Sequence, residues 1–417
     1  MTRPAMDVLV LGGGVIGLSC AVNLLDAGRS VTVLEQGTAG SAASHGNCGT
    51  LTPSHAAPLA TPDTLRSALG WLLKADAPLR IGLRADPALL RWLLGFARNC
   101  NWRTAEHAAM VKAPLLRRSR ELIEELVQRE RLDCEFDAIG TLNVYRDGAN
   151  FEHAQILLRR FADLGMRVET LDPAQTLARE PALKPGMAGA FFHPGDAQLR
   201  PDRYVAELAR IVRAKGGSIE EHTRVEGFER DGERIAQVTT SKGNFSAREV
   251  VLALGAWSPQ LASQLGLRIP IQPGKGYSIT YTRPACCPRI PLTLKEPSVC
   301  VTAWESGYRL GSTMEFAGYD STLNRTRLDA LKRGAAQFLR EPEGPAVVEE
   351  WYGWRPMTPD DLPVLGRAPG VDNLILATGH GMLGVTLSAV TGLLVSEVAT
   401  GRRVSFDLAP FSAARFL

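Results

Sequence analysis

Three glycines near the start of the sequence have the spacing that allows a backbone to close around a pyrophosphate. Gly12, Gly14 and Gly17 form the pattern G-x-G-x-x-G, and Glu35 follows 18 residues after the third glycine. In such a pattern the first glycine makes a tight turn, the second lets backbone approach the phosphates, and the third lets a helix pack closely on a strand. A carboxylate at this separation reaches a ribose 2′-hydroxyl and repels a 2′-phosphate. These four residues therefore predict a dinucleotide site.

The elements that must position these residues are visible in the surrounding sequence. Residues 7–11 read as a short buried strand, residues 18–27 as an apolar helix that Gly28 ends, and residues 31–34 as a second strand. The N-terminus of that helix offers free N–H groups and the positive end of a dipole to phosphates. Glycine-rich turns are common, but this context favours dinucleotide binding over a purely structural turn. The motif by itself does not separate FAD from NAD.

Two later segments repeat the combination of an apolar strand and a glycine. Residues 249–254 lead into Gly255, and residues 373–378 lead into Gly379, with a helix expected from about Thr386. Continuous apolar runs of this kind are typical of parallel strands buried on both faces. Three separated strand-glycine-helix units predict one nucleotide-binding domain assembled from discontinuous segments. The sequence between them is expected to form a second domain.

The segment that follows the first unit changes from a helical pattern to a strand pattern. Apolar residues recur every three or four positions from Leu65 to about Glu130, and the last helix is expected at residues 113–131. Residues 134–137 and 141–145 then read as two strands. This segment is expected to contribute to the second domain.

The composition is ordinary for a globular enzyme and narrows the kinds of partner. The chain has 417 residues and a formal net charge of +3, with its lysines and arginines dispersed, which does not indicate nucleic-acid binding. Seven cysteines without C-x-x-C spacing and seven histidines without H-E-x-x-H predict neither a disulfide framework nor a metal site. No secretory signal precedes the first strand, so a reducing cytoplasm is expected. The apolar stretch 374–399 carries His380, Glu397 and four glycines, which argues against a membrane span.

Four further stretches of sequence match motifs of one enzyme family. They are residues 44–49 (SHGNCG) followed by 53–58 (PSHAAP), residues 273–278 (PGKGYS), residues 353–360 (GWRPMTPD) and residues 379–386 (GHGMLGVT). With the N-terminal glycine motif, the chain resembles the D-amino-acid oxidase-type family of FAD-dependent oxidoreductases, and the bacterial D-amino-acid dehydrogenases within it. The resemblance covers nearly the whole chain and implies FAD rather than NAD.

This resemblance implies an α/β fold with two domains. The first is a Rossmann-like FAD-binding domain of the glutathione-reductase type, assembled from residues 1–86, 199–266 and 351–417. The second is an α+β substrate-binding domain with a mostly antiparallel sheet, formed by residues 87–198 and 267–350.

The resemblance also implies which residues hold FAD, from its adenine to its flavin. Helix N–H groups after Gly379 would face the flavin pyrimidine, where they can stabilise negative charge on the reduced ring. Some amine dehydrogenases of the superfamily attach flavin to a histidine in the loop that contains His45; here a free His45 is expected. The residues that the resemblance places against FAD are Gly12, Gly14, Val15, Ile16, Gly17, Glu35, Gln36, Ser44, His45, Gly46, Asn47, Cys48, Val225, Gly255, Trp257, Gly379, Gly381, Met382, Leu383, Gly384 and Thr386.

Arg355 matches the arginine that binds the substrate carboxylate in this family. A planar guanidinium makes a bidentate, orienting pair with a carboxylate, which a lysine cannot reproduce. The alternative is a structural ion pair of Arg355 with Asp360 or Asp361. Related glycine oxidases carry a second arginine where this chain has Met382, which leaves Arg355 as the single clear carboxylate anchor. Three further candidates for catalytic or cavity-lining roles, against packing or flavin contact, are His55, Tyr277 and His380.

The reaction implied by the resemblance is oxidation of an amino acid at its Cα. We expect FAD-dependent oxidative deamination of D-amino acids: a hydride passes from Cα to flavin N5, and the resulting imine hydrolyses to a 2-oxo acid. The electrons then pass to a quinone or another carrier rather than to oxygen. One alternative is a dehydrogenase or oxidase of cyclic or secondary amino acids such as D-proline, cis-4-hydroxy-D-proline, sarcosine or glycine. Another is a flavoprotein subunit of a multi-subunit dehydrogenase.

An electron acceptor in a membrane raises the question of a peripheral membrane contact. The apolar residues 71–73 and 92–94 could lie against the inner face of the cell membrane. The other interpretation, which we favour, is the apolar face of a buried helix.

Overall fold

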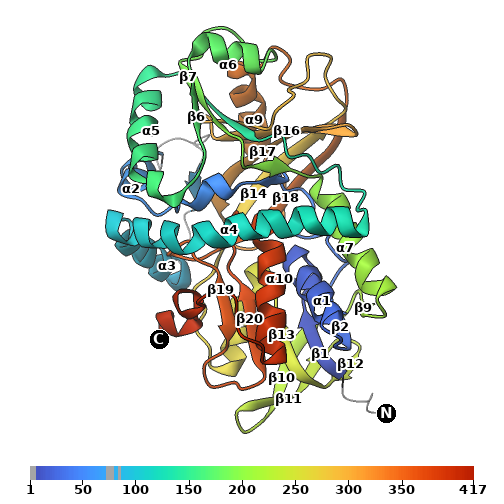
Figure 1. Cartoon of the computed structure of the whole chain (residues 1–417). Helices are drawn as coiled ribbons and strands as arrows, with labels where there is room; N and C mark the ends of the chain where they lie inside the picture. Colours follow the sequence, from blue (N-terminus) through green and yellow to red (C-terminus); the bar gives the residue numbers. More distant parts are fainter. Residues whose placement is uncertain (1–5, 72–78, 83–85) are drawn as a thin grey trace.

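Two large β-sheets organise the protein. The computed structural model describes residues 6–71, 79–82 and 86–417. One sheet has six strands and the other has nine. In Figure 1 the first lies in the lower half of the molecule and the second in the upper half, and the long helix α4 (Trp102–Glu130) crosses between them. The site described below lies where the two sheets approach each other.

The six-stranded sheet is built from segments that lie far apart in the sequence. Its order is β19-β20-β13-β1-β2-β9, and all neighbouring pairs are parallel except β19 with β20. The predicted assembly of buried parallel strands from three separated units is therefore confirmed. The strands are β1 (Met6–Leu11), β2 (Val31–Leu34), β9 (Ser218–Glu220), β13 (Ala247–Leu252), β19 (Val364–Arg367) and β20 (Leu374–Thr378).

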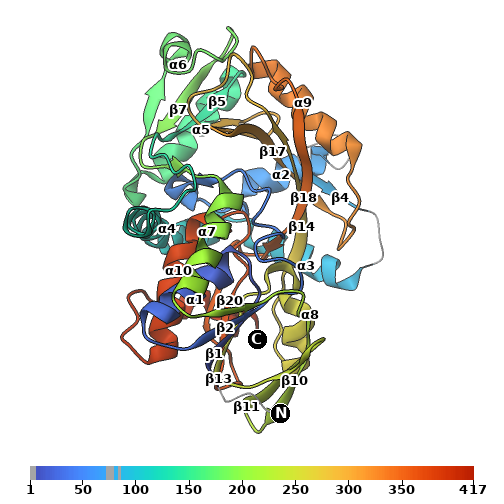
Figure 2. The same cartoon turned by 90° about the vertical axis from the view of Figure 1, so that its right-hand side faces the viewer.

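Alternation along β1 explains why both faces of this sheet are covered. Successive side chains of a strand point to opposite faces. Val8 and Val10 belong to the apolar core shared with the helices α1, α4, α7 and α10, whereas Leu9 and Leu11 belong to a second core under β10–β12 and α8. Figure 2 shows these two layers on either side of the sheet. The covering elements are α1 (Val15–Asp26), α7 (Pro201–Ala214), α10 (Gly384–Thr400), β10 (Val225–Asp231), β11 (Arg234–Thr240), β12 (Gly243–Phe245) and α8 (Ser258–Ala262).

The nine-stranded sheet is mostly antiparallel, as expected. Its order is β18-β14-β17-β16-β15-β5-β7-β6, with β4 paired to β17. The pairs β15–β5 and β4–β17 are parallel, and the other pairs are antiparallel. The strands are β4 (Leu79–Ile81), β5 (Thr141–Tyr145), β6 (Glu169–Leu171), β7 (Gly189–His193), β14 (Gln272–Tyr281), β15 (Leu292–Leu294), β16 (Val299–Trp304), β17 (Gly307–Phe316) and β18 (Val347–Met357).

The remaining elements surround this second sheet or connect the two. Helix α9 packs against β17 and β14, and α2 contacts β4. A two-stranded sheet joins β3 to β8 next to the site. These elements are β3 (Thr50–Leu51), α2 (Pro62–Trp71), α3 (Pro87–Asn99), α5 (Gly148–Arg160), α6 (Pro173–Arg179), β8 (Ala197–Gln198) and α9 (Arg325–Phe338).

Two expectations about local structure were wrong. Helix α4 does not begin at Ala113: it begins at Trp102, where the Asn101 side chain accepts a hydrogen bond from Thr104 N, and it continues through Pro114. Residues 134–137 do not form a strand, and only Asp137 makes a bridge, to Gln198. Glu135 has φ +47, a left-handed conformation that interrupts an extended chain.

The domain boundaries stay a prediction. The expected boundary at residue 351 falls inside β18, which pairs along its length with β14. Strand β4, expected in the nucleotide-binding domain, pairs with β17 of the nine-stranded sheet. Within the described residues, no helix has both the length and the apolar character needed to cross a bilayer.

Candidate active site

A cavity of about 830 Å³ runs between the two sheets. One end is lined by Glu35, Gln36 and Val225, at the carboxyl ends of β2 and beside β10. The other end is lined by residues of the nine-stranded sheet, Tyr277 and Arg355 among them. The carboxyl ends of parallel strands are the place where α/β sheets bind ligands. The cavity extends from this edge of the six-stranded sheet to one face of the nine-stranded sheet.

The glycine motif shapes the first end of this cavity. Gly12 has φ +106, and a Cβ on it would lie 2.5 Å from the carbonyl oxygen of Ala253. A Cβ on Gly17 would lie 1.8 Å from the carbonyl oxygen of Gly12, so α1 packs on the turn as only glycine allows. Gly14 differs: a Cβ there would meet only the Ser44 hydroxyl, at 3.6 Å. Its backbone therefore borders open cavity rather than protein.

Glu35 is held in a fixed position at the end of β2. Its two carboxylate oxygens accept hydrogen bonds from Gly13 N at 2.7 Å and Gly37 N at 2.9 Å. The side chain is buried but lines the cavity. A buried carboxylate with remaining lone pairs on both oxygens can accept hydrogen bonds from a ribose diol.

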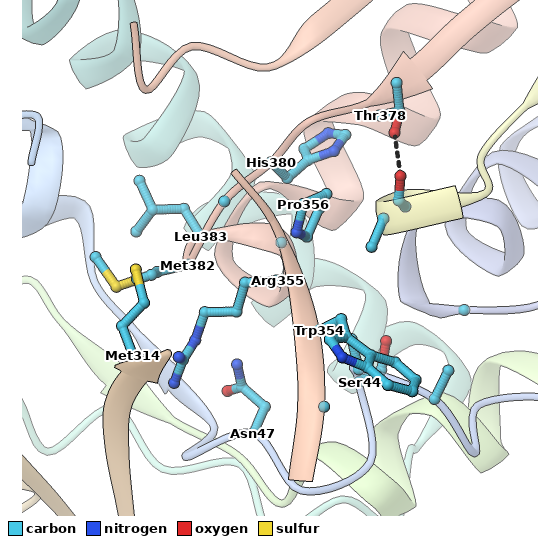
Figure 3. A pocket seen from close by; sticks show the side chains of 18 of the residues that line it. Ser44, Asn47, Met314, Trp354, Arg355, Pro356, Thr378, His380, Met382 and Leu383 are labelled. Carbon is cyan, nitrogen blue, oxygen red and sulfur yellow. Dashed lines mark hydrogen bonds between the residues drawn. The ribbon is translucent and has the colours of Figure 1, made fainter. Parts of the chain in front are cut away.

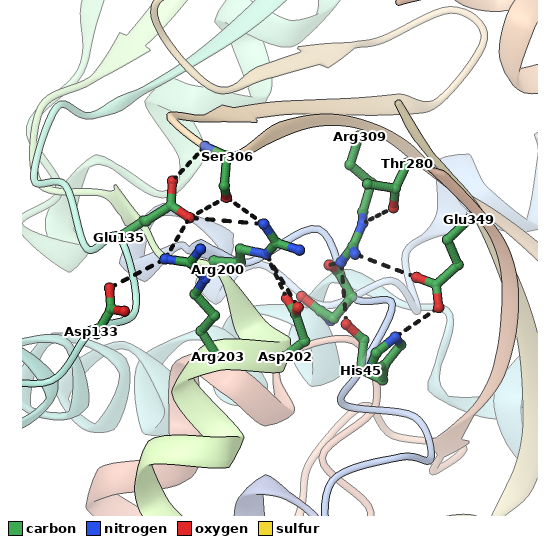
Figure 4. A network of polar contacts seen from close by, with 11 residues as sticks. His45, Asp133, Glu135, Arg200, Asp202, Arg203, Thr280, Ser306, Arg309 and Glu349 are labelled. Carbon is green, nitrogen blue, oxygen red and sulfur yellow. Dashed lines mark hydrogen bonds and ion pairs between the residues drawn. The ribbon is translucent and has the colours of Figure 1, made fainter. Parts of the chain in front are cut away.

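The loop 44–48 covers the middle of the cavity and is anchored at two points. The Ser44 hydroxyl accepts a hydrogen bond from Val15 N, the first residue of α1, at 3.1 Å. From the opposite side, buried Arg309 of β17 donates through Nη1 to the carbonyl oxygens of His45 (3.2 Å) and Asn47 (2.7 Å), while its Nε donates to Thr280 Oγ1 at 2.9 Å (Figure 4). Arg309 thus holds the loop backbone to the second sheet.

The His45 side chain leaves the cavity. Its Nε2 pairs with Glu349 Oε1 at 2.8 Å, as Figure 4 shows, and His45 is not among the described residues that line the cavity. The hydrogen bond to Glu349 raises the pKa of His45 and lowers the pKa of Glu349. The imidazole of His45 therefore helps to anchor the loop 44–48 through Glu349.

Arg355 enters the cavity from β18 and reaches over the neighbouring strand. A Cβ on Gly276 of β14 would lie 2.3 Å from Arg355 Nη1, so the guanidinium crosses β14 where a side chain is absent. Nη1 donates to the carbonyl oxygen of Thr313 on β17 at 2.7 Å. In Figure 3 the guanidinium points toward Met314 and Asn47.

No carboxylate among the described residues pairs with Arg355. The two acids considered as partners are committed elsewhere: Asp360 pairs with Arg415 at 2.7 Å, and Asp361 with Lys112 at 2.8 Å. Burial lowers the pKa of Arg355. An arginine remains charged even so, and its Nε and Nη2 keep free donors for a bidentate anion.

The other predicted catalytic candidates also line the cavity, but two of them have protein partners. The Tyr277 hydroxyl donates to Glu315 Oε2 at 2.6 Å, and burial raises the pKa of Tyr277. His380 Nε2 lies 3.0 Å from Thr391 Oγ1, and burial lowers the pKa of His380 to about 3. The His55 imidazole makes no hydrogen bond to a described residue, and burial lowers its pKa to about 3. Both imidazoles are therefore neutral at pH 7.

Two thiols meet on the cavity floor. The thiols of Cys48 in the loop and Cys300 in β16 interact, which lowers the pKa of Cys48 and raises the pKa of Cys300. Gly311, opposite Cys300 in the sheet, makes room: a Cβ there would lie 2.6 Å from Cys48 Sγ.

Comparison with known proteins identifies the family. The family described as FAD dependent oxidoreductase matches residues 7–398, which is most of the chain. The chain belongs to this family. It is 36% identical to a D-amino acid dehydrogenase of Paramagnetospirillum magneticum and 31% identical to one of Xanthobacter autotrophicus, over 99% of both chains in each case.

Solved structures confirm the predicted fold class of this FAD-dependent oxidoreductase. Glycine oxidase from Geobacillus kaustophilus superposes with a TM-score of 0.81 at 26% identity, covering 99% of both chains. L-proline dehydrogenase from P. horikoshii superposes with a TM-score of 0.75 at 19% identity, covering 100% of this chain and 98% of the other, which bears on the fold alone. FAD as the cofactor is confirmed with the family.

The cavity of this FAD-dependent oxidoreductase fits its cofactor. Two polar atoms on the cavity wall, Trp354 Nε1 and Thr313 Oγ1, are buried and have no hydrogen-bond partner among the described residues. Such groups call for a ligand that supplies an acceptor or donor. At the other end, the backbone of Gly14 borders open space and the Glu35 carboxylate can accept hydrogen bonds from a ribose, so polar groups suited to a dinucleotide lie at both ends of the cavity.

Most residues that the resemblance placed against FAD do line the cavity, and four do not. Gly17 supports the turn, His45 pairs with Glu349, Gly379 makes a turn at φ +72, and Thr386 Oγ1 accepts a hydrogen bond from Thr52 N at 3.2 Å. Cofactor contact of the individual residues stays a prediction. The predicted residues on the cavity wall are Gly12, Gly14, Val15, Ile16, Glu35, Gln36, Ser44, Gly46, Asn47, Cys48, Val225, Gly255, Trp257, Gly381, Met382, Leu383 and Gly384.

Sequence reasoning missed the walls that the second sheet and α3 contribute. Lys295, Cys300 and Thr313 line the cavity from β15–β17, and no local motif marks them. Trp92 of α3, in a segment considered for membrane contact, is buried in an apolar cluster with Phe316 and donates to the Met357 carbonyl at 2.8 Å. Leu94 on the same helix is exposed. Residues 72–73 lie outside the described part of the chain, and membrane contact stays a prediction.

Proposed function

We propose that this protein oxidises D-amino acids by removing a hydride from Cα, giving an imine that water converts to a 2-oxo acid. The observation that carries the proposal is Arg355: a buried cation in the cavity, fixed by the Thr313 carbonyl, with no carboxylate partner among the described residues. A buried charge without a partner is costly, so a ligand carboxylate is its natural complement. The names of the curated relatives support the D configuration.

The chain's own residues have orienting and electrostatic tasks in this reaction. Arg355 binds the α-carboxylate through Nε and Nη2 and so fixes the direction of the Cα–H bond. The neutral imidazoles of His55 and His380 add no positive charge near the substrate amine. Helix α10 begins directly after the cavity residues Met382 and Leu383. The free N–H groups of its first turn face the cavity and favour negative charge in it. FAD, when bound, supplies the hydride acceptor at N5.

The desolvated setting of Arg355 also favours a neutral substrate amine. A cation beside an ammonium group lowers the pKa of that group, and burial has the same effect. The amine then keeps the lone pair from which the imine forms as hydride leaves Cα. No protein side chain is required to take the proton from Cα in this scheme.

An anaerobic absorbance titration of the purified holoprotein tests the proposal. D-alanine, D-proline and cis-4-hydroxy-D-proline are each added next to their L-forms. Bleaching of the oxidised flavin band by D-forms alone is the expected result. Bleaching by proline-type substrates alone would favour the cyclic-amine alternative. A protein that no amino acid bleaches would overturn the proposal, and activity restored by a partner protein would then favour the subunit alternative.

We also propose that the physiological acceptor is a quinone or another carrier and not oxygen. The curated relatives are named dehydrogenases, which supports this choice. Mixing the substrate-reduced protein with either a soluble quinone or air-saturated buffer in a stopped-flow instrument separates the two. Reoxidation that is faster with air than with the quinone would contradict the proposal.

A further inference from the structure

Lys295 brings a second positive charge to the end of the cavity where Arg355 lies; the third cation of the described lining, Arg224, is at the nucleotide end beside Val225. Lys295 follows β15 directly, in the turn between β15 and β16, and it lines the cavity together with Arg355. No carboxylate of a described residue pairs with Lys295, and the Lys295 ammonium makes no hydrogen bond to any described residue. The neighbouring Glu296 is used elsewhere, since its Oε1 accepts hydrogen bonds from Arg146 N (3.1 Å) and Asp147 N (3.0 Å).

Strand register places Lys295 in the same row of the sheet as the carbonyl that holds Arg355. Leu294 of β15 is opposite Val299 of β16, and Val299 is opposite Ser312 of β17. One residue further along β15 and β17, and one residue back along the antiparallel β16, Lys295 is level with Thr313, whose carbonyl oxygen accepts from Arg355 Nη1. Two strand spacings, about 10 Å, separate the backbones of Lys295 and Thr313. A lysine side chain spans much of this distance, so a small ligand can contact both cations.

The acids on the cavity wall do not neutralise this pair. Among the described residues that line the cavity, the acids are Glu35, at the nucleotide end, and Asp361, which is paired with Lys112. His55, which also lines the cavity, has a pKa of about 3 because it is buried and faces Lys295, His193 and Lys112. This part of the cavity therefore carries an excess of positive charge and an imidazole to which no described residue makes a hydrogen bond.

We propose that Lys295, with His55 beside it, forms a subsite for an acidic group on the substrate side chain, so that the preferred substrates are dicarboxylic D-amino acids. Arg355 binds the α-carboxylate and Lys295 the distal carboxylate. The substrate class rests on the proposed function, but the subsite itself does not require a reaction. A monocarboxylic amino acid neutralises one of the two cations, whereas a dicarboxylic one neutralises both, which removes the cost of burying an unpaired ammonium.

Binding of ligands that cannot be oxidised tests the subsite without any turnover. Glutarate and its monoamide glutaramate have nearly the same shape and differ by one charge. Each is titrated into the holoprotein, and binding is followed by the shift in flavin absorbance. A charge-assisted contact of about 1.5–3 kcal/mol corresponds to binding of glutarate about 10- to 100-fold tighter than glutaramate. Equal affinity of the wild-type protein for the two ligands would overturn the proposal.

Variants at Lys295 then assign the preference to this side chain. Lys295→Met removes the charge and keeps most of the aliphatic stem, while Lys295→Arg keeps the charge. We expect the ratio of the glutaramate Kd to the glutarate Kd to fall to about 1 in K295M and to stay above 1 in K295R. FAD content and thermal midpoint verify that both variants fold. A ratio in K295M that equals the wild-type ratio would overturn the assignment.

The same variants test the substrate class. In the wild-type protein, kcat/KM for D-glutamate is expected to exceed that for D-glutamine, and the excess is expected to vanish in K295M. If the wild-type protein oxidises D-glutamine as well as D-glutamate, the substrate class is wrong. If no amino acid reduces the flavin, the proposed function fails, whereas glutarate discrimination that depends on Lys295 would still establish the subsite.

Discussion

A hydrogen bond fixes the guanidinium of Arg355 to the backbone carbonyl of Thr313, a residue whose own backbone is strained. Nη1 of Arg355 donates to the Thr313 carbonyl at 2.7 Å, and Thr313 has φ +55. Ser312 before it has φ 124, and the pairing of β14 with β17 shifts register between Lys275 and Tyr277. A left-handed conformation is costly for a β-branched residue and tends to occur where function requires it. Here the irregular backbone turns one carbonyl toward the guanidinium and leaves its other donors for a ligand.

Thr313 is therefore expected to tolerate glycine better than a comparable threonine. Thr302 of β16 is the matched control, because it is also buried, its hydroxyl has no hydrogen-bond partner in the described part of the chain, and it does not have a positive φ. In Thr313→Gly the relief of about 1–2 kcal/mol of strain offsets the entropy cost of glycine, whereas Thr302→Gly loses about 2 kcal/mol of stability. Thermal unfolding of both variants measures this. Equal destabilisation of the two would show that the Thr313 backbone is not strained.

Removal of the Arg355 guanidinium is expected to abolish most of the activity without loss of FAD. In Arg355→Met, kcat/KM for the best D-amino acid should fall on the order of 10²–10³-fold, because a positioned charge contact to the reacting substrate is worth about 3–4 kcal/mol. Arg355→Lys should recover little, since a lysine offers a single point of contact and loses its proton more readily when buried. Exposed Arg325, paired with Glu350, provides the control variant Arg325→Met. Full activity of R355M would exclude Arg355 as the carboxylate anchor.

Gly14 and Gly17 are expected to fail in different ways when replaced by alanine. A Cβ on Gly14 meets only Ser44 Oγ at 3.6 Å, so Gly14→Ala should fold but place a methyl group where backbone must approach the pyrophosphate. FAD affinity should weaken about 10-fold or more, a loss of about 1.4 kcal/mol. A Cβ on Gly17 lies 1.8 Å from a carbonyl oxygen, so Gly17→Ala should be poorly folded even without FAD.

Circular dichroism of the FAD-free proteins separates these two outcomes, and fluorescence of released FAD measures the affinity. A G14A protein that binds FAD as tightly as the wild type would mean that the cofactor does not approach this turn. A stable G17A protein would contradict the packing of α1 on the turn.

Local sequence patterns were sufficient wherever one short segment determines the geometry. The turn at Gly12, the close packing at Gly17 and the position of Glu35 after β2 all follow from contacts within one strand-turn-helix unit. The parallel strands were predictable for the same reason, because burial on both faces leaves a continuous apolar run such as Leu374–Thr378.

The errors arose where tertiary contacts decide the local structure. The last helix was expected to begin at residue 113, yet α4 begins at Trp102 and continues through Pro114, because burial of Leu115 and Leu116 against the core outweighs one lost backbone hydrogen bond. Glu135 interrupts an expected strand with a positive φ, and its carboxylate instead accepts a hydrogen bond from Ser306 N at 3.0 Å, in the network of Figure 4. Lys295 could not be found, because its approach to Arg355 depends on the register of five strands, from β15 through β16, β17 and β14 to β18.

The ion pair of His45 and Glu349 predicts a loss of stability as the pH rises above about 6.5. The hydrogen bond to Glu349 raises the pKa of His45 in the folded state, so the folded protein keeps a proton that the unfolded chain releases. The contribution is complete below the unfolded pKa and disappears as the pH passes through the raised value. Both side chains are about one-third exposed, so the effect should be below about 1 kcal/mol.

In Glu349→Gln the thermal midpoint should fall less between pH 6.5 and 8.5 than in the wild type. Glu350→Gln is the control, because its partner Arg325 stays charged throughout, and a wild-type slope in E349Q would mean that His45 does not titrate against Glu349.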